Sequence, residues 1–295
     1  MEWYVFGLLA PAFWAMNNVF LKFLITNKFK SSYSTIVTIS SIDATFALTI
    51  SLLTPIEALF PYSIFAFLAG LLPLTAFWFY SKAILAEEIS RVATLFQLIP
   101  VFVVFLSVVF LNEVVGVQKY LGIGLVVLAS TMISYRKSFG KAFSGAAKFM
   151  TPFALIIAVY TIVDKYLLGL LNFWSVFFWN ILGTFCGAIM LLSRPKLRKV
   201  FHDTISSIAK KIVLVTIVGE GMYVAGTVCS LVALSLVEAP LASAFFGLQP
   251  FYVFFYVLFL SIFLPRILKE EINKLTLVLK ISAIALIFVG TWLII

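Results

Sequence analysis

Long apolar runs alternate with short polar segments along the whole chain. A helix that crosses a bilayer needs about 20 mostly apolar residues. Ten runs of roughly this length cover residues 3–25, 33–53, 62–86, 90–111, 117–135, 150–171, 173–193, 211–236, 240–263 and 275–294. They are continuously apolar, whereas the strands of a membrane barrel alternate apolar and polar positions over about ten residues. The pattern predicts an all-α integral membrane protein with ten transmembrane helices.

The composition excludes most soluble classes of protein. Of 295 residues, 63% are hydrophobic and only 11% are charged, against about 25% charged residues in soluble domains. A nucleic-acid-binding protein gathers its basic residues into one soluble patch, but here they lie in short gaps between apolar runs. Cys186 and Cys229 lie within apolar runs without metal-binding spacing, and the only histidine, His202, lies in a gap. We therefore expect no nucleic-acid partner, no metal and no cofactor.

The two halves of the chain resemble each other. A constant shift of 150 residues pairs Glu88 with Glu238 and Pro100 with Pro250, without a gap. A basic linker, residues 136–149, separates five runs in residues 1–135 from five in residues 150–295. Because five is odd, duplicated halves must cross the membrane in opposite senses. We therefore predict two inverted five-helix repeats.

The distribution of charge predicts the orientation. Eighteen of the 21 Lys and Arg residues lie at gaps on one side of this arrangement, and only Lys119 lies at a gap on the other. Loops rich in Lys and Arg stay in the cytoplasm. The gaps between runs 5 and 6 and between runs 7 and 8 are therefore expected in the cytoplasm, with both termini outside and the chain in the cell (plasma) membrane.

Several segments resemble a known family of transporters. The first half carries AFWAMNNVFLK (12–22), a stretch from Tyr80 to the acidic residue Glu113, and YLGIGLVVLAS (120–130). The second half carries VYTIVDKYLL (159–168) and ALSLVEAPLASAFFGLQPFYVF (233–254). These segments resemble the EamA-like branch of the drug/metabolite transporter superfamily. The resemblance implies ten helices in two inverted repeats, a substrate cavity between them, and secondary transport of a small metabolite or drug-like solute by alternating access.

Polar groups within the apolar runs are the candidates for chemistry, because an ionisable group inside a membrane is costly unless it is paired or hydrated. The candidates for binding substrate or a coupling ion are Asn18, Asp43, Gln97, Asp164, Lys165, Asn180 and Glu220. The candidate cavity aromatics are Trp14, Tyr80, Tyr160 and Tyr223. Asp43 and Glu220 lie deepest, and exclusion of water disfavours a charged carboxylate, so either is a candidate proton carrier. The structural alternatives are hydrogen bonds between helices for the polar groups and ordinary packing for the aromatic rings.

Pro100 and Pro250 occupy corresponding places in the two halves. Each proline removes a backbone hydrogen bond and kinks its helix. Interruptions at corresponding places in two halves point to the binding site of a transporter. We therefore expect both prolines to act as hinges.

Other classes of function stay open beside a transporter. A channel or scaffold is one alternative, and an intramembrane enzyme using Asp43 and Asp164 is another, although neither Asp lies in a GxGD setting. No other catalytic pattern is present, so we expect no enzyme. Glu220 and Asp43 are candidate partners for Lys165, and Lys82 is a candidate partner for Asp164. The two lysines, Lys165 and Lys82, favour an anionic or zwitterionic substrate. The expected partners are a small-molecule substrate and the lipid bilayer, with the chain a monomer or weak dimer.

Overall fold

The protein is built from helices. The computed structural model describes residues 2–27, 31–86, 92, 95–134, 143–206, 208–263 and 274–295, and this part of the chain contains no strand. Six helical stretches are long and apolar enough to cross a membrane: Trp3–Leu21, Ser32–Ser51, Tyr62–Ala83, Ala147–Leu168, Phe173–Ser193 and Lys210–Leu236. Shorter apolar helices cover Leu98–Leu111, Val117–Ala129 and Ser282–Ile294. The all-helical prediction is confirmed, and the apolar stretches are consistent with a membrane protein.

The helices follow the predicted apolar runs closely. The first half forms α1 (Trp3–Asn27), α2 (Ser32–Ser51), α3 (Tyr62–Ala69), α4 (Leu71–Ala86), α6 (Leu98–Leu111) and α7 (Val117–Ser134). The second half forms α8 (Phe143–Leu168), α9 (Phe173–Met190), α10 (Pro195–Ile205), α11 (Lys210–Leu236), α12 (Ala239–Phe246), α13 (Gln249–Phe263) and α14 (Lys274–Ile294). A 3-10 turn, η1 (Leu191–Ser193), joins α9 to α10. The pairs α3–α4 and α12–α13 each occupy a single predicted run, so both runs are interrupted.

Helix α10 was not predicted, because its segment is polar and was interpreted only as a gap between runs. Pro195 occupies the first turn, where its fixed φ suits a helix and its missing N–H costs nothing. Phe201 packs against a small cluster containing Ile36 and Val37 of α2. The hydroxyl of Thr204 donates to Ser34 Oγ at 3.2 Å. An amphipathic helix of this kind needs only one apolar face, which a count of long apolar runs does not detect.

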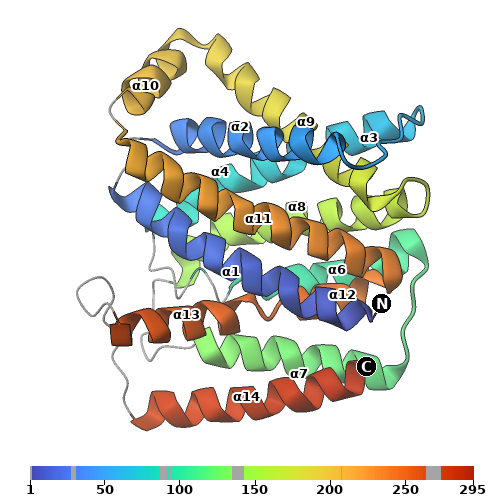
Figure 1. Ribbon diagram of the computed structural model, residues 1–295. Coiled ribbons are helices and arrows are strands. Elements are labelled where there is room, and N and C mark those ends of the chain that lie inside the picture. The colour runs from blue at the N-terminus through green and yellow to red at the C-terminus, as the bar shows by residue number, and fades with distance from the viewer. Residues whose placement is uncertain are drawn as a thin grey trace.

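Helices of the two halves pack against one another. Helix α1 lies along α11, α7 lies along α14, α4 and α6 pack on α8, and α2 and α3 pack on α9. Helices α12 and α13 lie against α1. Both termini lie at one end of the molecule, and α10 lies at the opposite end (Figure 1). The interior is therefore formed jointly by both halves of the chain.

Glycines allow the closest helix contacts. At the crossing of α3 and α9, a Cβ atom at Gly70 would overlap the carbonyl oxygen of Asn180. Where α7 meets α14, a Cβ at Gly122 would lie 2.7 Å from the carbonyl oxygen of Gly290, and a Cβ at Gly290 would lie 2.9 Å from that of Gly122. Small residues let helix backbones approach closely, which is a main source of helix association in membranes. These crossings bring α3 against α9 and α7 against α14.

Candidate functional site

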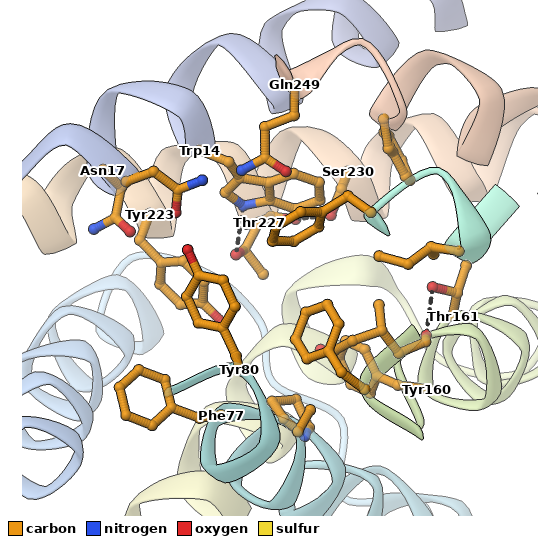
Figure 2. Close-up of a pocket in the computed structure, with 18 of the residues that line it drawn as sticks. Trp14, Asn17, Phe77, Tyr80, Tyr160, Thr161, Tyr223, Thr227, Ser230 and Gln249 are labelled. Atoms are coloured by element: carbon orange, nitrogen blue, oxygen red, sulfur yellow. Dashed lines mark hydrogen bonds between the residues drawn. The ribbon is translucent and has the colours of Figure 1, made fainter. Parts of the chain in front are cut away.

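A cavity of about 260 Å³ lies between the two halves. Its wall is built by α1, α2, α4 and α6 from the first half and by α8, α9, α11, α12 and α13 from the second. Figure 2 shows Trp14, Tyr80 and Tyr223 converging on this space. Of the residues expected to bind substrate or a coupling ion, the cavity is lined by Asn18, Asp43, Asp164 and Glu220. All four expected aromatics, Trp14, Tyr80, Tyr160 and Tyr223, also line it.

Two carboxyl groups meet at the cavity wall. Asp43 of α2 is 5% exposed and Glu220 of α11 is 3% exposed, and their carboxyl groups are hydrogen-bonded to each other. Asn17 Nδ2 donates to Glu220 Oε1 at 3.3 Å and to the carbonyl oxygen of Gly219 at 2.9 Å. Carboxylate oxygens only accept hydrogen bonds, so a bond between two carboxyl groups requires one proton. Asp43 Oδ1 is buried and has no hydrogen-bond donor among the described residues.

A third carboxyl group, that of Asp164, lies at another part of the same wall. Asp164 is 2% exposed, and its Oδ1 accepts a hydrogen bond from Asn180 Nδ2 at 2.8 Å. Tyr160 also hydrogen-bonds the Asp164 side chain, and its hydroxyl lies 3.2 Å from Asn180 Nδ2. Asn180 does not line the cavity itself, and its hydrogen bond holds the Asp164 side chain from outside the cavity lining. Its own Oδ1 is buried without a partner in the described part of the chain.

The aromatic part of the wall is held by its own contacts. Trp14 Nε1 donates to Thr227 Oγ1 at 3.4 Å, and the Trp14 ring packs edge-on against Phe246 with ring centroids 5.4 Å apart. Tyr80 packs edge-on against Phe96 at 5.6 Å and lies tilted against Phe153, also at 5.6 Å. Edge-to-face pairs at these separations are favourable. The rings are therefore positioned before any ligand enters.

Gln97 lies outside the cavity lining and joins the two halves. Its Nε2 donates to the carbonyl oxygen of Gly247 at 2.8 Å, and Gly247 is the position that the shift of 150 residues pairs with Gln97. A Cβ at Gly247 would lie 3.1 Å from Gln97 Oε1. A side chain at position 247 would therefore crowd the Gln97 amide.

Lys165 also lies outside the cavity lining. Its side chain reaches the junction between the C-terminal end of α11 and the start of α12. Its Nζ donates to the carbonyl oxygens of Leu234 and Val237, both at 2.8 Å, and lies 3.7 Å from Glu113 Oε1. Glu113 Oε2 accepts the backbone N–H of Ala239 at 2.8 Å. A cation at a helix C-terminus and an anion at a helix N-terminus both satisfy free backbone groups.

These contacts correct the partners expected for the charged residues. Lys165 pairs with Glu113 rather than with Glu220 or Asp43. Asp164 contacts Asn180 and Tyr160 rather than Lys82, whose Nζ lies 5.7 Å from the centre of the Trp78 ring.

Both candidate hinge prolines line the cavity. Pro100 lies in the first turn of α6 and Pro250 in the first turn of α13. The second interruption is a full break rather than the expected kink, because α12 ends at Phe246 and α13 begins at Gln249. A proline is tolerated in the first turn, where its missing N–H would have no helical partner.

Several lining residues were not predicted from the sequence. Asn17 contacts Glu220, whereas only its neighbour Asn18 was selected. The hydroxyl residues Thr161, Thr227 and Ser230 also line the cavity. Thr161 and Ser230 bond carbonyls of their own helices, as such residues commonly do, so their presence in an apolar run gives no signal. The described residues contain no group of three or more His, Cys, Asp and Glu that could hold a metal.

Comparison with known proteins agrees with this architecture. Residues 1–135 match the model of the EamA-like transporter family. A search of curated proteins finds no significant match. A solved structure described as "Crystal structure of protein" has a similar fold, with a TM-score of 0.71 and 14% sequence identity over 98% of this chain and 94% of that one. That identity shows a shared fold alone. Residues 1–135 are therefore similar to the EamA-like transporter family, which is part of the drug/metabolite transporter superfamily.

Proposed function

We propose that the protein is a secondary active transporter that moves a small solute across the membrane by alternating access, with a proton as the coupling ion. The observation that carries this proposal is a cavity between the two halves with buried carboxyl groups in its wall. Ionisable groups placed inside a membrane generally serve substrate or proton pathways. The similarity of residues 1–135 to a transporter family supports this assignment over an enzyme, a channel or a scaffold.

We further propose ten transmembrane helices in two inverted repeats. Exchanging the halves makes α1 equivalent to α8, α4 to α11, and α6 to α13. The contact of α1 with α11 then corresponds to that of α8 with α4, and the contact of α1 with α13 corresponds to that of α8 with α6. Gln97 touches Gly247, its own counterpart, as a residue does when it lies beside the axis that relates two repeats. Such an axis in the membrane plane supports rocking of one repeat against the other.

The hydrogen-bonded pair Asp43–Glu220 is the proposed proton carrier. One proton joins two carboxyl groups in this arrangement, and the pair lines the cavity. A change of access that admits water to the pair stabilises its charged form and releases the proton. Because α2 and α11 come from different halves, relative movement of the halves also changes the distance between the two carboxyl groups. Both effects couple the position of the proton to the direction in which the cavity opens.

Transport by purified protein in liposomes tests the proposal. We expect a panel of radiolabelled amino acids, amines, nucleosides and sugars to include a solute that accumulates under an imposed pH gradient. A pH-sensitive dye inside the vesicles should report proton movement when that solute is added. Asp43→Asn and Glu220→Gln keep the side-chain shapes but remove the titrating groups, so accumulation driven by the pH gradient should be lost.

Glu238→Gln is the matched control, because Glu238 is exposed and forms no side-chain hydrogen bond at the start of α12. This variant should accumulate solute like the unaltered protein. If no solute in the panel crosses faster than in protein-free vesicles, the transporter assignment is wrong. If transport occurs but never responds to pH, only the proton coupling is wrong.

A further inference from the structure

The charges around the cavity are of one sign. Three carboxyl groups, those of Asp43, Asp164 and Glu220, line it, and no Lys, Arg or His occurs among the described residues of its wall. Lys165 is held by Glu113 and two carbonyl oxygens at the ends of α11 and α12. A buried anionic ligand needs a positive partner, and the described part of this wall supplies none. This arrangement argues against the anionic or zwitterionic substrate that Lys165 and Lys82 suggested from sequence.

One hydrogen-bond acceptor in the cavity wall, Asp43 Oδ1, has no donor among the described residues. This oxygen is buried, whereas Asp164 already receives hydrogen bonds from Asn180 and Tyr160. A buried acceptor without a donor is costly. The N–H groups of an alkylammonium ion are donors only, so such an ion would satisfy this oxygen and balance the charge of the carboxyl pair.

The aromatic part of the cavity wall can bind the apolar end of an alkylammonium ligand. The rings of Trp14, Tyr80, Tyr160 and Tyr223 line the same space. Aromatic faces attract cations and also pack well against flat apolar groups. The volume of about 260 Å³ lies just below the range of about 300–1,000 Å³ typical of ligand pockets. A compact ligand with one ring therefore fits better than an extended drug with several.

We propose that the cavity binds a small organic cation, with its cationic nitrogen against Asp43 and Glu220 and its apolar ring against the aromatic wall. This inference rests on the proposed function and names the substrate class of the same site. A quaternary ammonium ion gains the charge and cation–π contributions but donates no hydrogen bond to Asp43 Oδ1. A primary or secondary amine is therefore the preferred member of the class.

A matched set of three ligands tests the charge preference directly. Phenethylamine, 3-phenylpropanoate and 2-phenylethanol share a ring and a short linker, and they are cationic, anionic and neutral at neutral pH. Binding to the purified full chain in detergent can be followed by isothermal titration and by the shift in unfolding temperature. We expect phenethylamine to bind at least tenfold more tightly than the other two. Equal or tighter binding of the anion or the alcohol, or no binding of phenethylamine, would overturn the proposal.

Variants locate the binding site. Asp43→Asn should weaken phenethylamine binding at least tenfold, whereas Asp43→Glu keeps the charge and should retain most of it. Glu238→Gln should bind like the unaltered protein. Size-exclusion profiles identify variants that have not folded, and the Asp43→Glu variant keeps the comparison valid if Asp43→Asn does not fold. Unchanged binding by a folded Asp43→Asn variant contradicts the proposed position of the nitrogen.

The binding measurement separates this inference from the transporter assignment. Binding in detergent requires neither a closed vesicle nor a gradient, so it can succeed even where transport fails. A transporter that moves only neutral or anionic solutes in liposomes would keep the proposed function and overturn the cation proposal.

Discussion

Lys165 and Glu113 connect the last turn of α8 to the junction between α11 and α12, which lies far from both residues in the sequence. Lys165 Nζ binds carbonyl oxygens at the end of α11, and Glu113 accepts the first N–H of α12. The two side chains are 20% and 15% exposed, so both remain largely screened from solvent. Their contacts indicate that they stabilise the junction between α8, α11 and α12 rather than bind a solute.

Lys165→Ala should therefore lower the stability of the protein by about 1–3 kcal/mol, the usual cost of losing hydrogen bonds to a charged group. The measurement is the apparent unfolding temperature of the purified protein in detergent. Lys82→Ala is the matched control, because Lys82 is exposed and contacts only an aromatic face among the interactions described; surface changes of this kind usually stay within about 0.5 kcal/mol. Equal unfolding temperatures for the two variants would contradict the structural role of Lys165.

Sequence reasoning selected the ionisable residues well but could not assign their partners. The cost of placing a charge inside a membrane singled out Asp43, Asp164, Lys165 and Glu220, and three of them line the cavity. The partners depend on how each helix is rotated about its axis. Asp164 and Lys165 are adjacent, so their side chains leave α8 in different directions, and only Asp164 reaches the cavity.

At the scale of elements, the interruption between α12 and α13 places Pro250 beside the cavity, and Pro100 lies at the corresponding place in the first half. Pro100→Ala and Pro250→Ala restore a backbone N–H and so allow a more continuous helix. We expect each change to lower the initial rate of solute uptake in liposomes severalfold at near-normal expression. Pro195→Ala, at the start of α10 and away from the cavity, should transport normally. Normal rates of solute uptake by both the Pro100→Ala and Pro250→Ala variants would show that these prolines are not hinges.

The existence of most helices could be predicted, but their finer shape could not. Continuous apolar length is a strong signal for a spanning helix. It does not show that the run 62–86 divides at Gly70 into α3 and α4, where the chain also crosses α9 closely. It also does not detect α10, whose apolar side chains are too few and too widely spaced to form a run.

At the scale of the whole molecule, the termini lie together at the end opposite α10 (Figure 1). The basic residues of α10, among them Lys196 and Arg198, belong to the gap that the charge distribution assigns to the cytoplasm. The arrangement of the helices and the positive-inside rule together predict that both termini are outside.

A C-terminal green fluorescent protein fusion should therefore be dark, because that reporter folds in the cytoplasm. A single cysteine at exposed Glu238, introduced after Cys186 and Cys229 have been replaced, should react in intact cells with a maleimide that cannot cross membranes. A cysteine at exposed Lys199 should react only after the cells are opened. A bright fusion together with the reverse labelling pattern would show the opposite orientation.

The shape of the cavity is the property furthest from the sequence. The internal similarity of Glu88 with Glu238 and of Pro100 with Pro250 predicts two related halves, but it does not specify how closely they approach. The volume between them depends on the contact of Gln97 with Gly247 and on the rotation of every lining helix. These are tertiary quantities that no local pattern encodes.

The mutual contact of Gly122 and Gly290 limits how this sequence can change over generations. At each position, the first atom of any new side chain meets a backbone oxygen of the opposite helix, 2.7 or 2.9 Å away. A neighbouring side chain could change its rotamer, and a later substitution could make it smaller, but a carbonyl oxygen is present whatever residue carries it. Neither position can therefore compensate for the other, and mutational drift at one leaves the other equally constrained. A library randomised at both sites and selected for folded protein should return glycine at both, with neither substitution rescued by a change at its partner.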